Sequence, residues 1–283
     1  MNVSSGHKDI TIGIIDGPVD FSHPAFQGSK IRTAKNSQVA ACRNASSMSC
    51  VHGTFVTGIL CAKRGLSAPA ICPDCEIILN PIFMEGRTNN NNKNKSNSIL
   101  PSATPEELSH AIIETIDSGA KIINLSLGLS TSSLTIFDRL QMAYDYALQK
   151  GVVIIVAAGN QGNIGNISLI KHQWTIPVTA CCEDGRLDPA SNFGPSIGNR
   201  GLMAPGVNIR STYPEGQYAQ MNGTSFAAPF VTGAIALLWS IFQNATAAMI
   251  IHSIMRAVPS NRHSIIPPIL NAEAAWDILK TLK

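Results

Sequence analysis

A serine between a glycine turn and a long apolar segment is the feature that most constrains this chain. Ser225 lies within residues 222–229, and a mainly apolar run follows over residues 230–239. This pattern predicts a helix with Ser225 at its N-terminus, where free backbone N–H groups and the helix dipole favour a developing negative charge. The stretch therefore predicts a nucleophile, which needs a base, a carboxylate to orient that base, and donors for an oxyanion.

Three other apolar runs supply candidates for these partners. Residues 10–15 read as a fully buried strand that ends at Asp16. Residues 152–158 read as a second buried strand, followed closely by Asn160, whose amide can donate a hydrogen bond. His52 opens the third run, which predicts a helix with His52 in its first turn. Because an α/β sheet presents functional side chains at the carboxyl ends of its strands, Asp16 is well placed to take part in the chemistry.

Five short blocks together resemble those of the subtilisin-like serine proteases. In order along the chain they read IIDGPVD, HGT, NLSLG, AAGN and NGTSFAAP. The resemblance implies an α/β, three-layer fold with a mostly parallel, twisted sheet flanked by helices. It also implies a serine endopeptidase in which Ser225 is the nucleophile, His52 is the base and Asp16 orients that base. Asn160 is the implied oxyanion donor, as is typical of this family.

The same resemblance implies where a peptide substrate binds. Ser126, Leu127 and Gly128 form one wall of the pocket for the side chain before the scissile bond, and their backbone pairs with the peptide as an added strand. Ala158 and Gly159 belong to the same substrate site. The bottom of the pocket is expected near residues 164–167, which include no Asp or Glu, so we expect small or apolar substrate side chains there.

A narrower resemblance concerns the first third of the chain. Three segments are similar to those of bacterial proteases that mature ribosomally made peptides, including the cyanobactin leader proteases. They are the block at residues 14–20, the compact segment 42–52 that leads to His52, and APAICP, which leads to NPIF. The implied reaction is removal of a leader from a precursor peptide. A general intracellular subtilisin remains an alternative. An inactive peptide-binding pseudoprotease is a third reading, but such a module would not need all four catalytic-type residues.

Length and composition limit the other function classes. A chain of 283 residues with 45% hydrophobic content is consistent with a single peptidase domain over residues 1–283. A net charge of +3 and scattered basic residues argue against a nucleic-acid partner, and the absence of an 18-residue uninterrupted apolar run argues against a membrane span. With no signal peptide or propeptide evident, we expect a cytoplasmic protein that needs no cofactor and no metal. Oligomeric state is left open.

Seven cysteines leave three interpretations open. They are free thiols, which an odd number in an intracellular protein favours. Alternatively, Cys72 or Cys75 forms a disulfide with the loop that carries Cys42 and Cys50. The third interpretation is a metal site at the C-x-x-C of Cys72 and Cys75, which would need a second ligand pair nearby.

Three further segments predict local structure. Residues 86–100 form a polar, Asn-rich insertion that reads either as a solvated loop or as a flap that contributes to substrate choice. His23 precedes Pro24, and we expect it to be a turn residue rather than a second catalytic histidine. Residues 65–75 carry only Asp74 as a carboxylate, so no calcium site is expected there.

Overall fold

A seven-stranded parallel sheet forms the centre of the molecule. The structure is a computed structural model that describes residues 3–35, 37, 40–68, 70–83, 85, 102–129, 137–164, 168–170, 172–258 and 264–282. The strand order is β2-β3-β1-β5-β7-β8-β9, and all neighbouring pairs are parallel. The strands are β1 (Thr11–Asp16), β2 (Ile31–Thr33), β3 (Glu76–Pro81), β5 (Ile122–Leu125), β7 (Val153–Ala157), β8 (Thr175–Cys181) and β9 (Leu202–Pro205). The predicted α/β fold with a mostly parallel sheet is confirmed.

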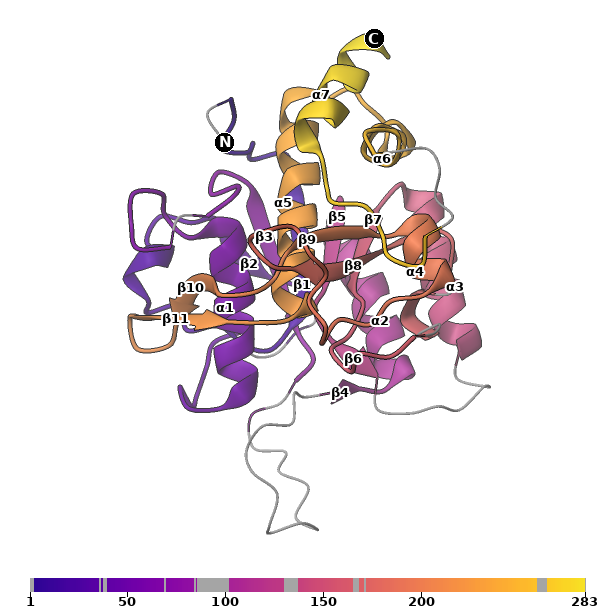
Figure 1. The fold of residues 1–283 in the computed structure, drawn as a ribbon. Coiled ribbons are helices and arrows are strands. Elements are labelled where there is room, and N and C mark those ends of the chain that lie inside the picture. The colour runs from indigo at the N-terminus through magenta and orange to yellow at the C-terminus, as the bar shows by residue number, and fades with distance from the viewer. Residues whose placement is uncertain are drawn as a thin grey trace.

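Helices cover both faces of this sheet (Figure 1). α1 (Met48–Cys61) and α5 (Thr224–Ile241) pack on one face, and α2 (Pro105–Asp117) and α3 (Phe137–Lys150) pack on the other. Alternate strand residues serve the two layers, since Ile14 belongs to the first core and Ile15 to the second. The remaining elements are α4 (Pro195–Arg200), α6 (Ala247–Arg256), α7 (Ala272–Thr281), the 3-10 turns η1 (Pro24–Phe26) and η3 (Ser168–Ile170), the antiparallel pair β10 (Ile209–Tyr213) and β11 (Gln217–Met221), and the short parallel pair β4 (Ser102–Ala103) and β6 (Gly128–Leu129).

Burial on both faces explains why the central strands have continuous apolar sequences. All six residues of β1 and all seven of β8 are buried. In the register of the sheet, Ile15 pairs with Leu125 of β5 on one side and with Asn80 of β3 on the other. β1 and β5 therefore end at the same edge of the sheet, next to β7, which pairs with β5.

The helix that carries His52 begins earlier than its sequence suggests. α1 starts at Met48, because the hydroxyl of Ser47 accepts a hydrogen bond from the backbone N–H of Cys50 and caps the helix. His52 consequently lies in the second turn of α1, and the prediction that it lies in the first turn is wrong. The prediction placed the start of the helix too late because polar residues precede the apolar run.

α5 is the core helix of the molecule. By length and composition alone it could cross a membrane, but 83% of its 18 residues are buried inside the protein. It contacts β5, β7, β8 and β9 of the sheet and the neighbouring helix α1. Its hydrophobicity is therefore accounted for by packing within the domain.

Gly58 provides a test of how closely α1 packs on β10. A Cβ at this position would lie 2.0 Å from Oγ1 of Thr212 and 2.6 Å from Oγ of Ser211. Both hydroxyls also donate hydrogen bonds to backbone carbonyls of α1. We expect Gly58→Ala to lower the free energy of unfolding by about 1–3 kcal/mol in urea titrations, because the overlap forces both side chains to move.

The neighbouring Thr57 offers a matched control. Its hydroxyl is buried and has no hydrogen-bond partner among the described residues. Thr57→Val keeps the shape and removes an unsatisfied polar atom, so stability should be unchanged or slightly higher. Equal losses in the two variants would contradict the packing argument.

Candidate active site

The edge where β1, β5 and β7 end brings together the polar residues singled out in the sequence. Asp16 is the last residue of β1, Ser126 follows β5 directly, and Asn160 lies just beyond β7. Three adjacent parallel strands place their carboxyl ends together, which is where ligands bind in open α/β sheets. α1 and the N-terminus of α5, which carries Ser225, pack against the same side of the sheet.

Asp16 and His52 form a buried pair. Their side chains are joined by a hydrogen bond of 2.7 Å between Nδ1 of His52 and Oδ1 of Asp16, and the two residues are only 3% and 1% exposed. The same Oδ1 accepts the backbone N–H of Gly17 at 2.6 Å. With a proton on Nδ1, the imidazole offers Nε2 as a proton acceptor. Among the described residues, Nε2 of His52 and Oδ2 of Asp16 have no hydrogen-bond partner.

Ser225 occupies the first turn of α5, as expected. Gly223 precedes the helix with a φ of 143°, a conformation that favours glycine. The hydroxyl of Ser225 donates to the backbone carbonyl of Ser126 at 3.3 Å, and the hydroxyl of Ser126 donates to the carbonyl of Ser225 at 2.7 Å. In this arrangement the Ser225 hydroxyl is bound to Ser126 rather than to His52.

The side chain of Asn160 is held by one end. Its Oδ1 accepts two hydrogen bonds from Thr224, one from the backbone N–H at 2.8 Å and one from the hydroxyl at 3.0 Å. The Thr224 hydroxyl in turn accepts the N–H of Gly159 at 3.0 Å. A Cβ on Gly223 would come within 3.1 Å of Nδ2 of Asn160, so the glycine keeps the surroundings of this NH2 group open. The fixed oxygen leaves the NH2 group as the end that can donate to a ligand.

The structure also brings together the residues expected to bind substrate. Ser126 and Leu127 are buried after β5, and Ala158 and Gly159 follow the adjacent β7. Gly128 begins β6, where it pairs with Ser102 of β4. Of the pocket bottom expected near residues 164–167, Ile164 is exposed, and residues 165–167 lie outside the described part of the chain, as does the insertion at residues 86–100.

Comparison with known proteins gives the site its context. A sequence profile of the Subtilase family, Peptidase S8, matches residues 7–271. The chain belongs to this family. It is 33% identical over 249 residues to a thermophilic serine proteinase of Bacillus sp. (strain AK1), covering 86% of this chain and 55% of that protein. It is 30% identical over 241 residues to subtilisin E of Bacillus subtilis (strain 168), covering 82% and 56%. The subtilase thus spans about half the length of the curated relatives it matches.

Solved structures extend the likeness over nearly all of both chains. The protease domain of PatA, as a serine-to-alanine mutant, superimposes with a TM-score of 0.83 at 27% identity and covers 100% of this chain and 99% of the other. The prenylagaramide maturation protease PagA gives a TM-score of 0.81 at 25% identity, with 98% and 96% coverage. The PatG macrocyclase in complex with peptide shares the fold, with a TM-score of 0.81 at 22% identity. The chain therefore has the family and the fold of the subtilisin-like serine proteases.

Residues that the motifs did not reveal also shape the site of the subtilase. Asn192 donates through Nδ2 to the carbonyl of Ala158 and to Oε1 of Gln161. Its Oδ1 accepts the backbone N–H groups of Gln161 and Asn163. One buried amide therefore fixes the loop that carries Asn160. Asn192 is about thirty residues away in sequence, and no spacing rule pointed to it.

His23 of the subtilase is a structural residue, as predicted. Its Nδ1 accepts the backbone N–H of Ala25 at 3.0 Å, which caps η1. Its Nε2 lies 2.8 Å from the carbonyl oxygen of Gln217 and donates to it. Both ring nitrogens are occupied by backbone groups, so the ring has no nitrogen left for proton transfer.

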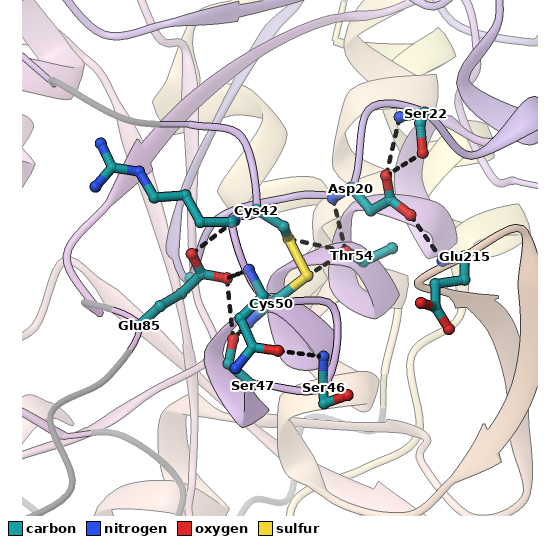
Figure 2. The surroundings of a disulfide bond; sticks show 12 residues. Asp20, Ser22, Cys42, Ser46, Ser47, Cys50, Thr54, Glu85 and Glu215 are labelled. Carbon is teal, nitrogen blue, oxygen red and sulfur yellow. Dashed lines mark hydrogen bonds between the residues drawn. A yellow bond between two sulfur atoms is a disulfide. The ribbon is translucent and has the colours of Figure 1, made fainter.

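A disulfide between Cys42 and Cys50 closes the loop before α1 (Figure 2). The predicted pairing of Cys72 or Cys75 with this loop is wrong, because the eight-residue separation lets the loop close on itself while Cys72 and Cys75 are free and buried elsewhere. The Cys72 thiol donates a hydrogen bond to Cys75, which, together with burial, raises the pKa of Cys72, and the same hydrogen bond lowers the pKa of Cys75.

The closed loop binds a carboxylate (Figure 2). Glu85 accepts the backbone N–H groups of Arg43 and Asn44 at 2.7 and 3.0 Å and the hydroxyl of Ser47 at 3.1 Å. Cys42, Cys50 and Glu85 are the one group among the described residues close enough to ligate a metal together. With both sulfurs bonded to each other, however, no thiolate is available as a ligand.

The disulfide should contribute measurably to stability. Closing a loop of this length removes unfolded-state entropy worth about 2–3 kcal/mol. We expect the Cys42→Ser/Cys50→Ser variant to lose about that much unfolding free energy in urea titrations. Cys182→Ser, which changes a half-buried free thiol, is the matched control and should lose little. A double variant as stable as the control would show that the crosslink adds nothing.

Proposed function

We propose that the subtilase hydrolyses peptide bonds through an acyl-enzyme on Ser225. The observation that carries this proposal is the buried Asp16–His52 hydrogen bond. It leaves Nε2 of His52, which has no partner among the residues that the structure describes, beside the N-terminal turn of α5. The ring lies against Phe226, the residue after Ser225, with centroids 5.6 Å apart. A base, an orienting acid and a serine at a helix N-terminus fit the nucleophile-and-base requirement of acyl transfer.

The reaction starts with movement of one proton. The Ser225 hydroxyl leaves the Ser126 carbonyl, turns to Nε2 of His52 and attacks the substrate carbonyl carbon as Nε2 takes its proton. Asp16 keeps the Nδ1–H tautomer and stabilises the imidazolium. His52 then gives the proton to the leaving amine, and a water molecule repeats the sequence to release the acyl group.

Asn160 is proposed as the oxyanion donor, together with the backbone N–H of Ser225. Thr224 fixes the Asn160 oxygen, so the NH2 group is preorganised to meet the negative charge as it develops. The N-terminus of α5 adds its dipole to the same site.

The proposed substrate is a precursor peptide from which a leader is removed. Support comes from the likeness to PatA and to PagA, which is described as a maturation protease. A general protease of broad specificity is the second candidate, favoured by the identity to subtilisin E. Location in the cytoplasm stays a prediction, and the Cys42–Cys50 disulfide counts against it because reducing compartments disfavour structural disulfides.

A library of unstructured peptides separates these functions. We expect the purified subtilase to react with a fluorophosphonate probe at Ser225, while mass spectrometry finds few cleaved library peptides. Ser225→Ala, the control, should neither label nor cleave. Broad cleavage lost in Ser225→Ala would instead favour the general protease. A wild-type protein that does not label would overturn the proposed enzyme activity.

Replacing Asn160 tests the oxyanion assignment. Asn160→Ala should lower kcat about a hundred- to a thousandfold with little change in KM, because the donor acts on charge that forms only in the transition state. The measurement is the steady-state rate of hydrolysis of a peptide that the wild-type protein cleaves. Asn163→Ala is the control, since its side chain is exposed and only its backbone N–H contacts Asn192. A loss confined to KM would contradict the assignment.

A further inference from the structure

The backbone carbonyl of Ser225 lacks its normal helical partner. In an α-helix this oxygen would accept the N–H four residues later, but that residue is Pro229, which has no N–H. The hydroxyl of Ser126 takes the missing place and donates to the carbonyl at 2.7 Å. An unsatisfied buried carbonyl is costly, so this donor fixes the first turn of α5 to the segment after β5.

The Ser126 hydroxyl is itself held by a chain of buried polar groups. Nδ2 of Asn124 donates to Oγ of Ser126 at 2.9 Å, and the hydroxyl of Thr232 donates to Oδ1 of Asn124 at 2.9 Å. Thr232 and Asn124 are fully buried, and Ser126 is 2% exposed. All the donors point the same way, from Thr232 towards Ser225, so each bond polarises the next.

Helix and strand geometry explain why the chain can form. Thr232 lies two turns after Ser225 on α5, and residues seven apart share one face of a helix. Asn124 and Ser126 are two residues apart, so they point to the same face of the sheet. The result is a second link between α5 and β5, deeper than the contact at Ser225 itself.

We propose that Thr232 is a positioning residue for the nucleophile, acting through Asn124 and Ser126. The inference rests on the proposed role of Ser225. Its consequence is specific: loss of the Thr232 hydroxyl frees the Asn124 amide to turn, which weakens the hold of Ser126 on the Ser225 carbonyl. The backbone carbonyl of Ser126 also accepts the Ser225 hydroxyl, so both the hydroxyl and the carbonyl of the nucleophilic residue are bound to Ser126.

A purely structural role is the competing explanation. A buried hydrogen bond in the core contributes to stability whether or not it orients a catalytic group. The two roles differ in their effect on the chemical step. A positioning role lowers the acylation rate in the folded protein, whereas a structural role lowers only the melting temperature.

The test compares three variants for the rate of fluorophosphonate labelling, kcat, KM and melting temperature. Thr232→Val keeps the shape and removes the hydroxyl, so labelling and kcat should fall about tenfold with KM unchanged, within the range known for small misplacements of reacting groups. Thr232→Ser restores a hydroxyl and should recover most of the rate. Thr179→Val, the control, removes a buried hydroxyl that has no hydrogen-bond partner in the described part of the chain and should keep the full rate.

The outcomes separate this inference from the function on which it rests. Wild-type labelling with an equal rate in Thr232→Val would overturn the positioning role alone, as would a Thr232→Ser variant as slow as Thr232→Val. A wild-type protein that does not label would overturn the proposed function, and this inference with it. If Thr232→Val fails to fold, Thr232→Ala removes the same hydroxyl with a smaller, strongly helix-forming residue and the same rates are expected.

Discussion

The hydrogen bond between Asp16 and His52 is the interaction around which this molecule is arranged. A carboxylate with 1% exposure is stable only if it is well partnered, and Asp16 receives both an imidazole N–H and a backbone N–H. The distance of 2.7 Å requires α1 to approach the turn after β1 very closely. Two glycines permit this approach. A Cβ on Gly17 would lie 2.0 Å from the carbonyl of Ser49, and a Cβ on Gly53 would lie 2.4 Å from the carbonyl of Gly17.

The groups around Ser225 are also held by hydrogen bonds between side chains and backbone. Thr224 holds the oxygen of Asn160, Asn192 holds the loop behind it, and Ser126 supplies the donor that Pro229 cannot. Each contact joins segments distant in sequence at one edge of the sheet. The geometry of the site therefore depends on the sheet and on the two helices, α1 and α5, that pack against this side of it.

Much of this could be anticipated from the sequence because it depends on local pattern. The buried strand before Asp16 and the helix after Ser225 are contiguous apolar runs, and the motifs around them are ordered along the chain. The start of α1 was hidden because the capping residue, Ser47, precedes the apolar run. The pairing of Cys42 with Cys50 could not be derived, since loop closure depends on tertiary position. The role of Thr232 was equally hidden, because a threonine in an apolar helix gives no sign of which buried amide it meets.

The Cys42–Cys50 loop fixes the position of Glu85 through hydrogen bonds to its carboxylate. Glu85 is the last described residue before the Asn-rich insertion, and three donors of one crosslinked loop hold its carboxylate. The crosslinked loop therefore holds the chain at Glu85 beside α1, the helix that carries His52. Because this point is held by the crosslink and three hydrogen bonds, we expect sequence changes after Glu85 to leave the Asp16–His52 pair in place.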